Sequence, residues 1–82
     1  METFELYPNP TSSTFNVNLG FSSPKKVGIG IYNMMGQKMA RIQPGTVQTF
    51  EQNINVSSWA AGIYLVTVQT PEGETVKRIS IQ

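Results

Sequence analysis

Apolar residues alternate with polar ones along most of this chain, in short runs that proline- or glycine-containing segments separate. Phe15, Val17 and Leu19 fall on one parity, whereas Asn16 and Asn18 fall on the other. A period of two is typical of a half-buried strand, because a helix would place its apolar residues three and four positions apart. The alternation therefore predicts an all-β fold.

Seven runs carry this strand pattern at regular intervals. Such a series predicts an immunoglobulin-like β-sandwich of about seven short antiparallel strands with Greek-key-like connections. The runs are residues 4–7, 14–19, 27–32, 37–42, 46–56, 63–70 and 75–82, with residues 20–24 and 43–45 among the predicted loops and turns.

Three details of this sandwich can be predicted. Residues 37–42 alternate weakly, so we expect them at a sheet edge. Residues 63–70 are substantially apolar on both faces, which favours a central strand. Gln52 interrupts the alternation of residues 46–56, and we expect a β-bulge at that position.

The residue types needed for most chemistry are missing. The chain of 82 residues is long enough for one domain, residues 1–82, but it contains no histidine, cysteine or aspartate. The usual zinc and calcium ligand sets are therefore excluded, and so are disulfides. Acid–base catalysis needs histidine or paired carboxylates in a cleft, whereas Glu72 and Glu74 flank a turn glycine. We expect no enzymatic activity and no cofactor.

Charge and hydropathy exclude two classes of partner. The net charge of +1 is too small for a surface that neutralises phosphates, so we expect no nucleic-acid binding. The longest apolar run, residues 59–66, is far shorter than the roughly 20 residues of a membrane-spanning helix, so we expect no membrane insertion.

Two apolar features have alternative interpretations. Met34, Met35 and Met39 surround a predicted turn, where methionine could form an adaptable contact surface or fill gaps in a small core. Trp59 lies just ahead of the most apolar predicted strand, residues 63–70, where it could pack in the core or stack against a ligand.

Three segments in register resemble a known family. They are residues 6–11 (LYPNPT), residues 29–37 (IGIYNMMGQ) and residues 59–66 (WAAGIYLV). Together with a basic final strand, they resemble the C-terminal sorting domain of type IX secretion cargo in Bacteroidota. The family positions matched here are Tyr7, Pro8, Asn9, Pro10, Asn33, Gly36, Gly62, Tyr64, Lys77 and Arg78, whereas Trp59 stands where the family often has leucine.

The resemblance implies a non-catalytic secretion signal. Such a domain directs the N-terminal cargo domain of the same parent chain through the type IX outer-membrane translocon, with a shuttle protein and a sortase as further partners. The sortase normally cleaves the domain off, at a position expected before or near Met1. The implied location is the periplasm in transit, followed by the outer membrane, the cell surface or the medium.

The feature that the translocon recognises could lie in the last strand, because an open sheet edge can be recognised by backbone pairing. The hypothesis for translocon recognition therefore rests on residues 75–82, and its candidates are Lys77, Arg78, Ile79, Ser80, Ile81 and Gln82. The alternative for the basic pair is a solvated strand face, and open edges could also allow weak self-association. The alternative function is an immunoglobulin- or fibronectin-like binding or spacer module of a secreted adhesin or glycosidase.

Overall fold

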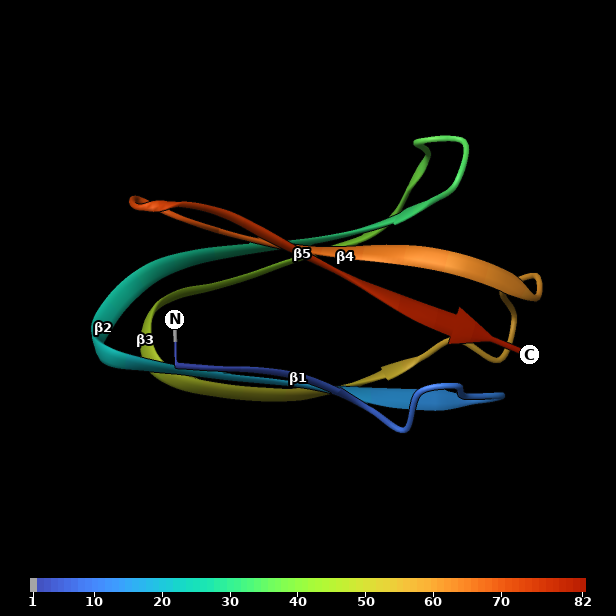
Figure 1. Ribbon diagram of the computed structural model, residues 1–82, viewed down its shortest axis with the longest axis horizontal. Helices are drawn as coiled ribbons and strands as arrows, with labels where there is room; N and C mark the ends of the chain where they lie inside the picture. The colour runs from blue at the N-terminus through green and yellow to red at the C-terminus, as the bar shows by residue number, and fades with distance from the viewer. Residues whose placement is uncertain (1) are drawn as a thin grey trace.

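The alternating runs form one antiparallel sheet that folds over into two layers (Figure 1). The computed structural model describes residues 2–82, so Met1, near which the cleavage position is expected, lies outside the described residues. The five strands are β1 (Thr3–Tyr7), β2 (Thr14–Asn33), β3 (Lys38–Asn55), β4 (Gly62–Thr70) and β5 (Gly73–Ile81). Over this part of the chain, no helix is long and apolar enough to cross a membrane.

The all-β class is confirmed, but the count of about seven strands is wrong. Residues 14–19 and 27–32 are two halves of β2, and most of residues 37–42 and 46–56 form the two halves of β3. The segments predicted as loops, residues 20–24 and 43–45, are bends inside these strands. The pairing register shifts between Gly20 and Lys25, and Gly45 has a φ of 84°. Because β2 and β3 bend together, they stay paired on both sides of the bend (Figure 1).

The pairing order places β2 in both layers. Its first half lies between β1 and β3, and its second half lies between β3 and β4. Strand β4 pairs with β2 and β5, which confirms its predicted central position. Within residues 2–82, β3 pairs only with β2, as expected of an edge strand. The bulge predicted at Gln52 is wrong, because Gln52 pairs with Val17 in continuous register.

The inward-facing residues of both layers form one core. Side chains on a single parity of each strand are buried, and burial of each large one contributes about 1.5–3 kcal/mol to folding. The fully buried large side chains are Phe15, Val17, Leu19, Ile31, Val56, Val66, Val68 and Ile79. Trp59 packs against this core, as its core interpretation predicts.

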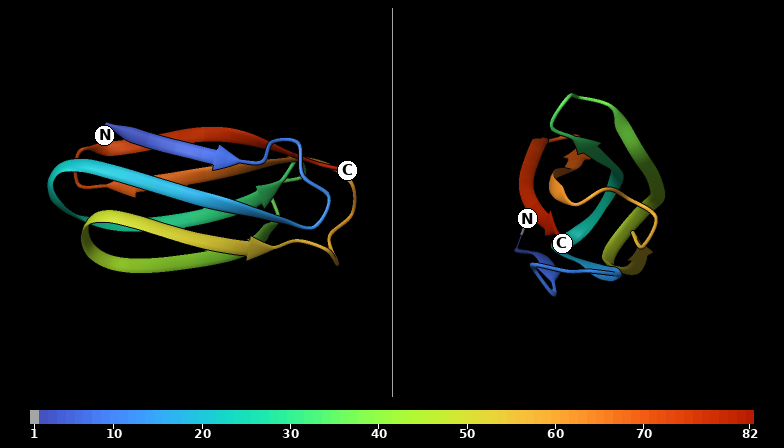
Figure 2. Two further views of the ribbon diagram at one scale, coloured as in Figure 1. Left: turned by 90° about the horizontal axis from the view of Figure 1, so that it is seen from below. Right: turned by 90° about the vertical axis from the view of Figure 1, so that its right-hand side faces the viewer.

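The strand directions separate the molecule into two ends. One end carries the bends of β2 and β3 and the tight turn between β4 and β5, and β1 begins there (Figure 2). We call this the bend end. The other end, which we call the motif end, consists of residues 8–13, 33–37, 56–62 and 80–82. The end-on view in Figure 2 shows the strands arranged around one common axis.

Candidate functional site

The motif end brings together most residues that the sequence singled out. The Pro8–Pro10 corner, the turn from Asn33 to Gly36, Gly62 and the last residues of β5 all lie there, although they are far apart in the sequence. Lys77 is the exception, because it lies midway along β5, opposite Val66 of β4.

The corner after β1 serves as a partner for the end of β5. The Asn9 side chain donates from Nδ2 to the Arg78 carbonyl oxygen at 3.0 Å, and its Oδ1 accepts the Ser80 amide at 3.0 Å. Thr11 extends the contact, because its amide donates to the Ser80 carbonyl at 2.9 Å and its carbonyl accepts the Gln82 amide at 2.8 Å. The side chain of Asn9 and the backbone of Thr11 therefore take the place of a neighbouring strand along the end of β5.

This contact changes which part of the terminal strand is accessible. Outward-facing backbone groups alternate along an edge strand, so those of Glu74 and Val76 point the same way as those of Arg78 and Ser80. The outward backbone groups of Arg78 and Ser80 already bond to Asn9 and Thr11. Ile79 and Ile81 are buried in the core. Among residues 77–82, the surface of the terminal strand therefore comes from the exposed Arg78 and Gln82 and the half-buried Ser80, together with Lys77.

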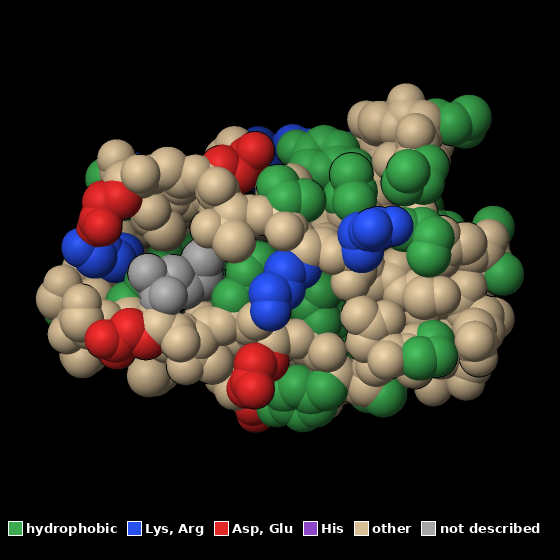
Figure 3. All heavy atoms as spheres, in the orientation of Figure 1, with side chains coloured by type: hydrophobic (Ala, Val, Ile, Leu, Met, Phe, Trp, Pro, Cys, Tyr) green, Lys and Arg blue, Asp and Glu red, His purple; other side chains and the backbone are tan. Residues whose placement is uncertain are grey.

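The basic pair is split between two environments. Lys77 shares the parity of the buried isoleucines, and its ammonium donates to the Phe4 carbonyl oxygen and lies 5.3 Å from the centroid of the Phe4 ring. This side chain therefore connects β5 to β1, which are both edge strands of the folded sheet, with a cation–π contact. Figure 3 shows this face, where Lys and Arg side chains lie over hydrophobic ones. Arg78 has the opposite parity and points away from the core.

Asn33 determines the shape of the turn between β2 and β3. Its Oδ1 accepts the amides of Met35 at 3.0 Å and Gln37 at 2.9 Å, and its Nδ2 donates to the Gln37 side chain at 3.0 Å. Gly36 has a φ of 85°, a left-handed conformation that residues with a side chain rarely adopt. The turn holds Met34 and Met35 in solvent at 66% and 87% exposure, whereas Met39 packs against the core.

Tyr64 fixes the connection from β3 to β4. The ring is buried and lies 5.3 Å from that of Trp59, and its hydroxyl donates to the Ala60 carbonyl at 2.6 Å. The Trp59 amide donates to the Val56 carbonyl at 2.9 Å, which closes the turn that leads into Gly62. The family positions Gly62 and Tyr64 thus shape the backbone of the motif end.

Two polar partners in this region were not predicted from the sequence. The Tyr7 hydroxyl donates to the Glu51 carboxylate at 2.7 Å, and this hydrogen bond, with partial burial and the charges of Glu51 and Glu5, raises the pKa of Tyr7. Thr11 is buried, and its hydroxyl donates to the Thr14 carbonyl. Thr11 lies within the resembling segment LYPNPT, so its position was a usable signal, whereas nothing local identifies Glu51.

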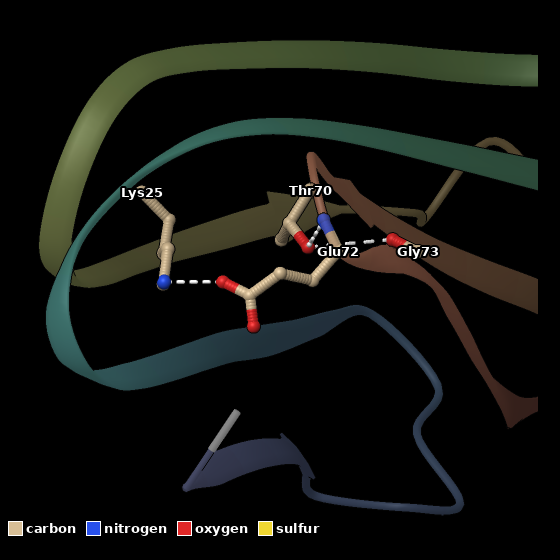
Figure 4. Close-up of polar contacts among 4 residues, drawn as sticks. All are labelled: Lys25, Thr70, Glu72 and Gly73. Atoms are coloured by element: carbon tan, nitrogen blue, oxygen red, sulfur yellow. Dashed lines mark hydrogen bonds and ion pairs between the residues drawn. The ribbon is translucent and has the colours of Figure 1, made fainter.

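The bend end contains a polar hollow of about 290 Å³, lined in part by Lys25, Glu72 and Glu74. Lys25 and Glu72 form an ion pair that joins β2 to the β4–β5 turn, and Thr70 Oγ1 accepts the Glu72 amide at 3.2 Å (Figure 4). Lys25 lowers the pKa of the exposed Glu72 carboxyl. Within residues 2–82, no three acidic, histidine or cysteine side chains gather into a metal-binding group.

The fold and the motif end define a small all-β domain in which turn-forming residues and the terminal strand share one surface. Over residues 5–82 the sequence matches the family described as "Secretion system C-terminal sorting domain". It is also 32% identical over 77 residues to beta-agarase D of Zobellia galactanivorans, covering 94% of this chain and 14% of that protein. The chain belongs to the family of C-terminal sorting domains carried by type IX secretion cargo.

Family membership defines the general role of the domain. The chain is a C-terminal secretion sorting signal from a family whose members are not catalysts. A sorting signal implies export to the cell surface or the medium, and it implies a cargo domain in the parent chain. The chain spans about 14% of the length of its agarase relative.

Proposed function

We propose that the type IX outer-membrane translocon reads this domain in its folded state, at the motif end. The segment that carries the cargo joins the domain at the start of β1, which lies at the bend end. A folded domain would then enter the machinery with the motif end accessible and the cargo behind it. On this proposal, the address includes the outward side chains of Arg78, Ser80 and Gln82, together with the turns around them.

The observation that supports this proposal is the convergence of the motif residues. Asn9, the turn from Asn33 to Gly36, and Gly62 are distant in sequence, and each shapes a turn at the same end of the molecule. Antiparallel pairing already places these turns at one end, but the family positions are concentrated in them rather than in the bends and the turn of the bend end. A shared surface gives a reason for their common location, because loops and turns on a rigid scaffold are frequent binding sites.

The later steps of export belong to the same proposal. A shuttle protein and the sortase meet the domain after passage through the periplasm, and the sortase cleaves the chain before or near Met1. The cargo is then released or attached to the outer membrane. The domain itself contributes recognition, and the chemistry of cleavage belongs to the sortase.

A secretion assay tests the proposal. A fluorescent reporter with a signal peptide is fused before the intact domain and expressed in a Bacteroidota strain that has the type IX system. We expect reporter in the medium or on the cell surface, and we expect retention in the periplasm of a strain without the translocon. Equal export from both strains would overturn the proposed route.

A charge-matched pair of variants then locates the address. Arg78→Glu with Gln82→Glu alters the terminal strand at or beside the motif end, and Lys26→Glu with Thr75→Glu makes the same change in charge at or near the bend end. These four side chains are exposed, so both variants should fold, which urea denaturation would check. We expect export to fall only in the first variant. Unchanged export of the first variant, or an equal loss in both, would contradict recognition at the motif end.

A further inference from the structure

The motif end carries a second surface that the terminal strand does not share. The turn between β2 and β3 and the start of β4 border a hollow of about 240 Å³. A cavity of about 150 Å³ holds benzene, so this hollow can accommodate one large apolar side chain. Residues 33–35 and 60–64 line it.

The residues around this hollow are apolar and exposed. Met34 and Met35 are 66% and 87% exposed, and Ile63 at the start of β4 is 37% exposed. A large apolar side chain in solvent at the tip of a turn contributes nothing to the core, and methionine adapts its shape to many partners. Hydrogen bonds from both the side chain and the backbone of Asn33 hold the turn in shape, so little backbone entropy would be lost on binding.

The lack of charged side chains around the hollow indicates which kind of occupant it suits. Residues 8–13, 33–37, 56–63 and 80–82 contain no lysine, arginine, aspartate or glutamate. The nearest charge along the β2–β3 turn, Lys38, lies 5.7 Å from the centroid of the Tyr32 ring. An anionic or cationic partner would find no counter-charge here, whereas an uncharged apolar surface could be desolvated at low cost. Lysine, arginine and glutamate side chains lie instead along the strands and at the bend end.

We infer that this hollow, with Met34, Met35 and Ile63, binds an apolar side chain presented by a protein of the secretion machinery. This inference rests on the proposed function, and it adds a hydrophobic anchor to recognition at the motif end. Anchors of this kind carry much of the binding energy in protein interfaces, and polar contacts around them give register. The outward side chains of β5 would supply such polar contacts.

The test compares Met35→Glu with Val76→Glu in the same secretion assay. Both substitutions place a carboxylate at an exposed apolar position, 87% and 48% exposed, but Val76 lies on β5 away from the hollow. We expect Met35→Glu to lower export about tenfold, the change produced by losing one well-packed apolar contact, and Val76→Glu to leave export near that of the intact domain. Urea midpoints of both variants should match the intact domain.

Other results would overturn the inference. If Met35→Glu is exported normally while the translocon-deficient strain still retains the reporter, the hollow is not an anchor although the sorting function stands. If the intact domain is exported equally from both strains, the sorting proposal itself fails. Concentration-dependent dimers in analytical ultracentrifugation, abolished by Met35→Glu, would assign the surface to a second copy. Co-sedimentation with phosphatidylcholine vesicles, abolished by the same change, would assign it to lipid.

Discussion

Replacing Asn9 by alanine should release the end of β5 from the corner that caps it. The substitution removes both side-chain hydrogen bonds, to the Arg78 carbonyl and from the Ser80 amide. A typical intramolecular hydrogen bond contributes about 1 kcal/mol net, so the two together give an upper value of about 2 kcal/mol. Both groups lie at the surface, where water can replace the lost partner, and we therefore expect about 1 kcal/mol of destabilisation.

This loss is large enough to measure in a domain of this size. A change of about 1 kcal/mol shifts the melting temperature of a 60–100-residue domain by about 4–8 °C. Trp59 is the single tryptophan and packs against the core, so its fluorescence can follow unfolding in urea. Hydrogen exchange gives the local readout, because the Ser80 amide should lose protection while the amides of the central strand β4 keep theirs.

A control and a second variant sharpen the Asn9 experiment. Asn18→Ala removes a surface side chain whose Nδ2 contacts the Glu5 carboxylate at 3.3 Å, and we expect a change within about 0.5 kcal/mol. Asn9→Asp keeps an acceptor for the Ser80 amide but loses the donor to Arg78, so exchange at Ser80 should stay slow while stability falls. Asn9→Ala with unaltered stability and unaltered Ser80 exchange would refute the role assigned to the corner.

Three further predictions concern single side chains. Gly36→Ala should destabilise the domain by about 1 kcal/mol, because φ is 85° and no steric contact adds to the backbone cost; an unchanged melting temperature would contradict this. The raised pKa of Tyr7 means that its bond to Glu51 stabilises the fold fully below pH 10.0 and is lost as pH rises through the raised value. Tyr7→Phe should therefore reduce the loss of stability in alkaline urea titrations, and an identical alkaline loss would count against the bond. The lowered pKa of Glu72 means that its pairing with Lys25 stabilises the fold above pH 4.5 and is lost as pH falls through the lowered value, so an NMR titration of Glu72 with a midpoint at or above 4.5 would disprove the pairing.

The core and the strand class were predictable because burial follows a period of two. Phe15, Val17 and Leu19 are buried on the parity that their sequence indicates. The continuity of β2 and β3 was not predictable, because Gly20, Pro24 and their neighbours have the composition of a loop. A sheet can keep its pairing through a bend when two neighbouring strands bend together, and that is a property of the pair rather than of either segment.

The candidate site was predictable only in part. The motif residues Asn33 and Gly36 act locally, so the sequence identified their turn correctly. The contact of Asn9 with β5 joins residues about 70 positions apart, and no local pattern shows which segments meet. Lys77 could have been placed, since it shares the parity of Ile79 and therefore projects from the same face of β5, where its side chain stays exposed. Treating it with Arg78 as one basic pair concealed that difference.

The continuity of β2 and β3 through the bend also determines how the domain comes apart. Each layer contains one half of β2 and one half of β3. If one layer unfolded, the apolar face of the other layer would be exposed to water, so neither layer can unfold alone. Unfolding should therefore be all-or-none, with no half-folded species populated at equilibrium. A secretion address built in this way is either complete or absent, so a machinery that reads the folded domain, as proposed above, would reject a chain whose sorting domain is unfolded.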